Sequence, residues 1–259
     1  MAEQGIVTAC VVVIGNEILS GRTQDRNVNY LARGLEALGI RLREVRMIPD
    51  DRETIVGTVN ACRAAFDYVI TTGGIGPTHD DITSECVAEA FGVGLYRDPE
   101  VVELIRSYLR SGEMNEARMR MATFPEGAEL IANPVSAAPG YRIDNVFVLA
   151  GVPQIMQAMF DGMEHHLSGG ARMRARAVHV HLPEGAIAEA LGRVQERHPA
   201  IDIGSYPAMR GRRFGVSVVL RGTDGAALDR ALAEIREALV ALGGEPTDES
   251  PDNPPEPED

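Results

Sequence analysis

A glycine-rich turn followed by paired acidic residues is the part of this sequence best suited to chemistry. The segment reads Thr72-Gly73-Gly74-Ile75-Gly76-Pro77-Thr78-His79-Asp80-Asp81-Ile82-Thr83, and an apolar run precedes it. Because glycine has no Cβ, the oxygens of a phosphate can come close to the backbone N–H groups of such a turn. The helix predicted to follow adds unpaired N–H groups and the positive end of its dipole. The segment therefore predicts a site for a phosphate or another oxyanion.

The acidic residues of this turn decide how an anion could be held there. Thr78 and Asp81 have the spacing of a capping box, so we expect Thr78 to be the N-cap of the following helix. The carboxylates of Asp80 and Asp81 repel a phosphate unless a divalent cation such as Mg²⁺ bridges the two groups. We therefore expect Asp80 and Asp81 to hold such a cation. The alternative is that the glycines only form a tight turn and the aspartates complement the helix dipole.

Strands and helices that alternate along the first part of the chain must position this turn. Apolar or alternating runs at 8–14, 40–48 and 68–72 predict strands, and apolar residues at helical spacing follow each of them. This order predicts a mostly parallel sheet with helices on both faces. In such sheets ligands bind beyond the carboxyl ends of the strands, which share one edge. We therefore expect the polar loops at 15–17 and 50–51 to lie beside the glycine turn.

A second loop of small residues follows later in the same part of the chain. Helices are predicted at 98–112 and 114–121 and a strand at 128–131 before it, and a hairpin at 141–150 and a helix to 167 after it. The composition of this loop suggests a second anion-binding loop. Its sequence is Asn133-Pro134-Val135-Ser136-Ala137-Ala138-Pro139-Gly140.

The pattern changes after residues 168–170, which we interpret as a linker. Strands at 177–182, 201–206 and 214–221 and helices at 186–197 and 226–242 give the order β-α-β-β-α. This order predicts a small α+β domain at 172–243 with both helices on one face of an antiparallel sheet. Residues 245–259 hold five prolines and seven acids, so we expect a disordered acidic tail.

The composition of the chain argues against nucleic-acid binding and against membrane association. The chain has 259 residues and a formal charge of −13, and all 25 of its basic residues are scattered arginines. Without a basic stripe or any tryptophan, nucleic-acid binding is not expected. No apolar run reaches the length of a membrane span, and the first residues lack a basic signal region, so no membrane association is expected. Cys10, Cys62 and Cys86 read as buried free thiols, which is typical of a cytoplasmic protein.

The motifs resemble those of a known family. The segment 15–21 followed by Asn27, the segment 72–83, the loop 133–141 and Gly151-Val152-Pro153 are similar to four motifs of the CinA family. That family belongs to the molybdopterin-binding superfamily of molybdenum-cofactor biosynthesis proteins such as MogA and MoaB. The likeness spans about residues 8–167, and the unit at 172–243 also resembles the domain that follows in CinA proteins. It implies a three-layer α/β/α domain over residues 1–168.

The resemblance also implies a pocket at the strand ends for a phosphorylated pterin, such as molybdopterin, or a nucleotide. Some CinA-type domains are metal-dependent pyrophosphatases acting on ADP-ribose or FAD, and others are described only as pterin binders. We therefore expect a molybdopterin- or nucleotide-binding protein, with a divalent-metal-dependent pyrophosphatase as the alternative, in which Asp50 and Asp81 are catalytic. The expected ligand-binding residues are Gly15, Asn16, Glu17, Thr72, Gly73, Gly74, Gly76, Pro77, Thr78, Asp80, Ser136, Pro139 and Gly140.

The sequence departs from the family pattern in places that bear on catalysis. Ser136 and Ala137 stand where the third motif usually has Gly-Thr, Ala150 replaces a proline, and Gln154 replaces a glutamate. These changes leave open a third interpretation, an interaction protein with a degenerate pocket. The chain ends without the nicotinamide-nucleotide deamidase domain of longer CinA proteins, so deamidase activity is not expected.

Two further features bear on metals and partners. His179 and His181 alternate on one face of a predicted strand and could bind a metal, but without a third ligand a structural role is favoured. Methionine-rich helices at 114–121 and 156–163, together with the family resemblance, suggest a homo-oligomer, most simply a dimer.

Overall fold

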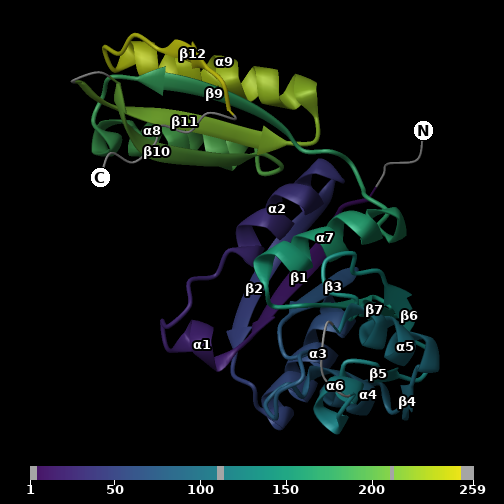
Figure 1. The fold of residues 1–259 in the computed structure, drawn as a ribbon. Helices are drawn as coiled ribbons and strands as arrows, with labels where there is room; N and C mark the ends of the chain where they lie inside the picture. The colour runs from purple at the N-terminus through teal and green to yellow at the C-terminus, as the bar shows by residue number, and fades with distance from the viewer. Residues whose placement is uncertain (1–4, 110–113, 211–212, 252–259) are drawn as a thin grey trace. The chain divides into compact units, whose positions relative to one another are not determined.

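The computed structural model describes residues 5–109, 114–210 and 213–251. The chain divides into two compact units, residues 1–171 and residues 172–259, and each is described by itself (Figure 1). No helix within the described residues is long and apolar enough to cross a membrane.

A six-stranded sheet forms the middle of the first unit. Its strand order is β2-β1-β3-β8-β7-β6. The pairs β2–β1, β1–β3 and β3–β8 are parallel, and β7 and β6 continue the sheet in antiparallel pairs. The bounds are β1 (Val7–Ile14), β2 (Ile40–Ile48), β3 (Tyr68–Thr72), β6 (Glu129–Ile131), β7 (Gly140–Ile143) and β8 (Val146–Leu149). The mostly parallel sheet predicted from the sequence is confirmed.

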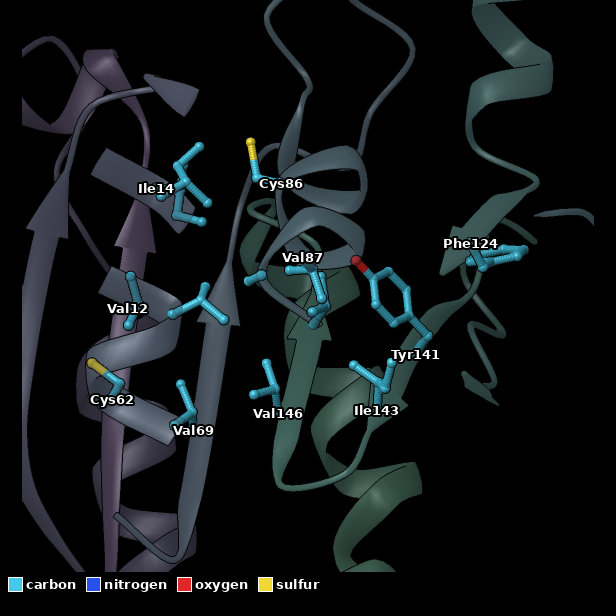
Figure 2. Packing of buried hydrophobic residues seen from close by; sticks show 14 of the residues in the cluster. Val12, Ile14, Cys62, Val69, Cys86, Val87, Phe124, Tyr141, Ile143 and Val146 are labelled. Atoms are coloured by element: carbon cyan, nitrogen blue, oxygen red, sulfur yellow. The ribbon is translucent and has the colours of Figure 1, made fainter. Parts of the chain in front are cut away.

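The side chains of β1 point alternately to the two faces of the sheet, and helices cover both faces. Ala9, Val11 and Val13 pack with α2 (Asn27–Ala37) and α7 (Pro153–Met163) on one face. Cys10, Val12 and Ile14 face the other way, toward α3 (Arg52–Ala65), α4 (Thr83–Phe91) and α5 (Pro99–Tyr108). Figure 2 shows the second of these clusters, with Cys62 of α3 and Val87 of α4 beside the strand residues. Because β1 is buried on both faces, its sequence is a continuous apolar run.

Short elements depart from the expected pattern. Residues 16–19 form a helix, α1 (Asn16–Leu19), where only a polar loop was expected. A two-stranded ribbon of β4 (Leu95–Arg97) and β5 (Thr123–Pro125) was not predicted, because three residues carry too little periodicity. The expected helix at 114–121 is α6 (Glu116–Arg120), and a turn of 3₁₀ helix, η1 (Glu164–His166), follows α7. Part of the helix expected at 98–112 lies outside the described residues.

The second unit is a four-stranded antiparallel sheet with two helices. The strand order is β10-β11-β9-β12, and the apolar residues of α8 and α9 pack on one face of the sheet. This agrees with the β-α-β-β-α order expected from the sequence, apart from the added last strand. The bounds are β9 (Arg174–Val180), α8 (Glu184–Arg197), β10 (Asp202–Arg210), β11 (Arg213–Gly222), α9 (Gly225–Ala241) and β12 (Thr247–Glu249).

The expectation that residues 245–259 form a disordered tail is wrong for β12. This strand pairs with β9, and the Glu249 side chain is only 3% exposed. The carboxylate of Glu249 accepts hydrogen bonds from Ser217 Oγ and from the guanidinium of Arg210, and Asp248 pairs with Arg236. Specific partners therefore hold an acidic segment that composition alone predicts to be disordered. Residues 252–259 lie outside the described part of the chain.

His179 makes the stability of the second unit dependent on pH. Its side chain is 1% exposed, and neither ring nitrogen has a hydrogen-bond partner among the described residues. Burial lowers the pKa of His179 below its ordinary value of 6.5, the neighbouring Arg210 and His181 lower it further, and Glu249 opposes them. The unfolded chain takes up a proton near pH 6.5 that the folded unit takes up only at lower pH. The associated stability is therefore complete above pH 6.5 and is lost as the pH falls toward the folded pKa.

We predict that the melting temperature of the second unit, measured by calorimetry, decreases as the pH is lowered from about 7.5 to about 5.5. His179→Gln removes the titrating group, so its fall should be smaller than that of the parent, whereas His165→Gln, at an exposed position, should behave as the parent does. An equal fall in His179→Gln and in the parent would show that His179 does not cause the dependence.

Candidate ligand-binding site

Three strand ends meet at Gly73. The Gly73 N–H donates to Leu149 O at the end of β8, over 3.1 Å. A Cβ on Gly73 would lie 2.2 Å from Ile14 O, at the end of β1, and a Cβ on Gly151 would lie 3.2 Å from Gly73 Cα. With φ at +103°, Gly73 also occupies a region that favours glycine. Only glycine therefore lets the backbone turn here and bring the three strand ends together.

The turn after β3 leaves backbone donors free. Thr83 closes the turn from the start of α4, since its Oγ1 donates to Gly73 O over 3.0 Å and its N–H to Gly74 O over 3.0 Å. Within the described residues, the N–H groups of Gly74, Ile75 and Gly76 donate to no other backbone or side-chain group. Successive free N–H groups after a glycine turn with positive φ are donors of the kind that can bind an anion.

The acidic end of the turn is held by Thr78. The Oδ2 atom of Asp81 accepts hydrogen bonds from Thr78 N, over 2.8 Å, and from Thr78 Oγ1. Hydrogen bonding from Thr78 also holds the pKa of the Asp80 carboxyl below its usual range. The predicted Thr78–Asp81 pair therefore exists, but Thr78 is not the N-cap of α4. The helix begins at Thr83 after Ile82, because Thr83 closes the turn and the capping pair lies within the loop.

Two more carboxylates come from neighbouring strand ends. Asp50 follows β2, and its Oδ2 accepts a hydrogen bond from Asn16 N over 2.8 Å at the start of α1. Gly15 N donates to Ile48 O over 3.1 Å, so the loops after β1 and β2 are joined directly. Glu17 of α1 folds back over Gly15, where a Cβ would lie 2.6 Å from its carboxylate. The convergence expected for the loops at 15–17 and 50–51 is therefore present.

Asn133 organises the second small-residue loop. Its Nδ2 donates to Ser136 Oγ and Ala138 O, each over 2.7 Å, and its Oδ1 accepts from Val135 N and Ser136 N. Ala137 has φ at +67°, which is uncommon for a residue with a side chain. The buried amide of Asn133 therefore fixes a loop that presents Ser136 to the cavity.

A cavity of about 540 Å³ lies where these loops meet. Its walls include the carboxylates of Glu17, Asp50, Asp80 and Asp81, and none of its described lining residues has a basic side chain. Apolar groups complete the walls, among them Ile14, Ile75, Met121, Val152, Pro153 and Ile155. The cavity thus combines free backbone N–H groups, an excess of negative charge and an apolar surface.

Most residues expected at the site line this cavity. They are Glu17, Asp50, Gly73, Gly74, Gly76, Pro77, Thr78, Asp80, Asp81 and Ser136. Five others lie outside its lining. Gly15 and Asn16 act through their backbones, Thr72 and Pro139 are buried, and a Cβ on Gly140 would lie 2.5 Å from Val148 O.

Three residues that hold the loops of the site stand in the family motifs, but the sequence analysis assigns them no role at the site. Asn27, 4% exposed at the start of α2, donates from Nδ2 to Gly151 O over 2.8 Å and so holds the loop after β8. Thr83 and Asn133 act in the same way on the other two loops. Their place within the family motifs is the sequence signal that could have pointed to them.

The carboxylates fit one kind of metal. Within the described residues, no set of three or more His, Cys, Asp or Glu side chains is arranged to hold a metal. Mg²⁺ commonly keeps several waters and takes one or two carboxylates together with substrate phosphates. Asp80 and Asp81 offer this smaller donor set at the cavity wall. They therefore fit a hard divalent cation that binds together with a phosphorylated ligand.

Comparison with known proteins identifies both units. Residues 10–167 match the model of a family described as a probable molybdopterin binding domain, and residues 172–243 match that of the FAD synthase middle domain. The structure of CinA from Thermoplasma acidophilum, a protein of unknown function, superposes with a TM-score of 0.59 at 32% identity, over 62% of this chain and 98% of that one.

Relatives are similar along most of the chain. A protein of Archaeoglobus fulgidus is 34% identical over 229 residues, which cover 88% of this chain and 96% of the relative. A CinA-like protein of Salinibacter ruber is 33% identical, and 88% of this chain aligns with 59% of it. A probable FAD synthase of Caenorhabditis elegans is 30% identical, and 90% of this chain aligns with 50% of it. The chain therefore belongs to the probable molybdopterin-binding domain family, as a CinA-like protein with a second domain of the FAD synthase middle-domain type.

Proposed function

We propose that the first unit binds a phosphorylated pterin or nucleotide, with its phosphate on the turn after β3. The observation that carries this proposal is the row of free N–H groups at Gly74, Ile75 and Gly76 in the wall of the cavity. Backbone donors of this kind hold phosphates without any basic side chain. The apolar walls suit the flat ring of a pterin or a nucleobase.

The charge of the cavity requires a cation beside the ligand. Four carboxylates line the walls, no described lining residue is basic, and Arg120 beside the turn, which donates to Thr78 O, is one positive charge against four negative ones. The net charge therefore repels a phosphate that binds alone. Asp80 and Asp81 would hold a divalent cation between themselves and the phosphate. Asp81 already uses Oδ2 on Thr78, so Oδ1 is the oxygen that would meet the cation.

A second candidate is a divalent-metal-dependent pyrophosphatase acting on ADP-ribose or FAD. It is favoured by Asp50, a carboxylate from a different strand end that lines the same cavity. In this role the turn orients the pyrophosphate, and Asp50 takes the proton of the attacking water. A divalent cation bound there polarises the phosphoryl oxygens. The third interpretation, a degenerate pocket used only for protein interactions, is disfavoured by the open cavity and the free N–H groups.

We predict that Gly74→Ala weakens ADP-ribose binding at least tenfold in isothermal titration with Mg²⁺. The new Cβ would lie 2.1 Å from Thr83 Oγ1, so the turn must shift and its N–H groups no longer converge. Gly92→Ala is the matched control, because Gly92 has φ at +65°, against +69° at Gly74, but ends α4 with open space around it. Each substitution should cost about 1 kcal/mol of stability from the strained backbone. Equal affinity in the two variants would mean that the turn does not bind the ligand.

The Asp81→Asn variant distinguishes a protein that only binds the ligand from one that also hydrolyses it. The amide keeps an acceptor for Thr78 but loses the charge that a cation needs, so ADP-ribose binding with Mg²⁺ should weaken and any hydrolysis should collapse. In the presence of a chelator, binding should instead tighten, because one repelling charge is gone. Asp51→Asn is a matched control, since Asp51 Oδ2 bonds Thr54 N and Oγ1 in the same manner outside the cavity.

The readouts of this experiment are calorimetric affinity and, by ³¹P NMR, the cleavage of ADP-ribose into AMP and ribose 5-phosphate. Turnover in the parent that persists unchanged in Asp81→Asn would contradict the catalytic role of Asp81. Absence of turnover in the parent with Mg²⁺, Mn²⁺ and Co²⁺ would leave the binding function alone.

A further inference from the structure

A second, smaller cavity adjoins the glycine turn. Its volume is about 40 Å³, and residues 74–76 and Asp81 line both this cavity and the main one. Arg120, the last residue of α6, lines only the smaller cavity, whereas the next residue, Met121, lines only the main cavity. The end of α6 therefore lies against the turn, and it brings a basic side chain that the described walls of the main cavity lack.

Arg120 is linked to Asp81 through Thr78. The Nη1 atom of Arg120 donates to Thr78 O over 3.1 Å, and this carbonyl also accepts from Asp81 N over 3.3 Å. Thr78 donates in turn from N, over 2.8 Å, and from Oγ1 to Asp81 Oδ2. Arg120 therefore holds the residue that orients the carboxylate of Asp81.

The short helix that carries Arg120 is anchored at both ends. Asn115 caps its start, and Glu116 forms an ion pair with Arg97 of β4 over 3.0 Å. Near its end, Thr123 of β5 donates from Oγ1 to a backbone carbonyl of the helix over 2.9 Å. Helix α6 is therefore tied to the ribbon of β4 and β5, which fixes the point from which its last side chain reaches the turn.

The carboxylate of Asp81 lies against the part of the turn where N–H groups are free. A Cβ on Gly76 would lie 2.6 Å from Asp81 Oδ2, and within the described residues the Gly76 N–H donates to no other group. A phosphate on the turn and a cation at Asp81 would therefore be neighbours. Because Mg²⁺ demands near-ideal coordination geometry, a small displacement of this carboxylate would weaken the binding of the cation and of the ligand together.

The charge of Arg120 does not by itself favour a cation. A guanidinium repels Mg²⁺, so its removal would make cation binding tighter if charge alone mattered. Arg120 and Thr78 are both exposed, however, and solvent screens an exposed charge. The hydrogen bond to Thr78 is therefore expected to matter more than the charge, and the two effects change the requirement for Mg²⁺ in opposite directions.

We propose that Arg120 is a positioning residue of the ligand site. Through Thr78 it holds the carboxylate of Asp81 where a divalent cation, bound together with the phosphorylated ligand, would meet it. This role rests on the proposed function, because it concerns the cation that the phosphate requires there. It assigns a part in the site to α6, which lies outside the motifs that carry the family resemblance.

The test compares Arg120→Met, which removes the donor and the charge, with Arg120→Lys, which keeps both. ADP-ribose affinity is measured by isothermal titration over a series of Mg²⁺ concentrations. The Mg²⁺ concentration that gives half of the maximal affinity should rise about fivefold in Arg120→Met, as expected for one lost hydrogen bond, and should return close to the parent value in Arg120→Lys. Arg106→Met is the matched control, because Arg106 is an exposed arginine of α5 that pairs with Glu103 and lines neither cavity.

Two further readouts separate positioning from a general structural effect. In an Asp81→Asn background, Arg120→Met should change the Mg²⁺ requirement little, because the effect of Arg120 passes through Asp81. Without any ligand, the backbone amide of Thr78 should exchange faster with solvent in Arg120→Met than in the parent or in Arg106→Met, since its bond to Asp81 is loosened. Absence of ADP-ribose binding by the parent would count against the proposed function, whereas the exchange of Thr78 would still test the role of Arg120.

Four results would overturn the proposal. One is a Mg²⁺ requirement in Arg120→Met that stays within about twofold of the parent or falls, as loss of a positive charge alone would cause. Another is a failure of Arg120→Lys to restore the parent behaviour. The third is an undiminished effect of Arg120→Met in the Asp81→Asn background. The fourth is an unchanged exchange rate of the Thr78 amide in Arg120→Met.

Discussion

The site depends on the close approach of three strand ends at Gly73. The N–H of Gly73 is bonded to the end of β8, its Cα side faces the carbonyl that ends β1, and Gly151 packs against it. A side chain on Gly73 would separate these strands, since its Cβ would lie 2.2 Å from Ile14 O. The tight junction forces the chain to leave β3 in a left-handed turn, and that turn exposes the N–H groups of the following residues. The proposed anion site is thus a geometric consequence of how the sheet closes at this edge.

Electrostatics decide what this geometry can hold. A parallel sheet brings the loops after β1, β2, β3 and β8 to one edge, and in this chain three of those loops carry carboxylates. Free N–H groups attract an anion, while Glu17, Asp50, Asp80 and Asp81 repel it. A divalent cation would resolve the conflict, and it would also supply the chemistry of the proposed hydrolase. The two proposed functions, ligand binding and hydrolysis, therefore depend on the same charges and differ in the role they assign to Asp50.

The sequence predicts the structure well where a physical requirement permits only one pattern of residue types. Burial on both faces made β1 a continuous apolar run, and the need for positive φ made the turn after β3 rich in glycine. Topology then placed Asp50 beside that turn, although the two lie far apart in the chain. These features allow the fold and most of the residues that line the cavity to be predicted from the sequence.

Other features depend on contacts that no local pattern records. Asn27 reaches Gly151 across the sheet edge, and Asn133 folds its loop by bonding four backbone or side-chain groups. Thr78 matched a capping box in sequence, but the box lies inside the loop and Thr83 starts the helix. The acidic composition of β12 predicts disorder, but Arg210 of β10 and Ser217 of β11 bind the carboxylate of Glu249 and hold the strand in place. Each case is a long-range pairing that overrides local preference.

The most direct measurement is the response of individual backbone amides to a ligand. In ¹H–¹⁵N NMR spectra of the full chain, ADP-ribose added with Mg²⁺ should move the amide signals of Gly74, Ile75 and Gly76 more than any others. ADP-ribose added with a chelator should leave them nearly unchanged, because the carboxylates then repel the phosphates. Saturable binding that leaves these three signals in place, with shifts elsewhere in the chain, would contradict the account.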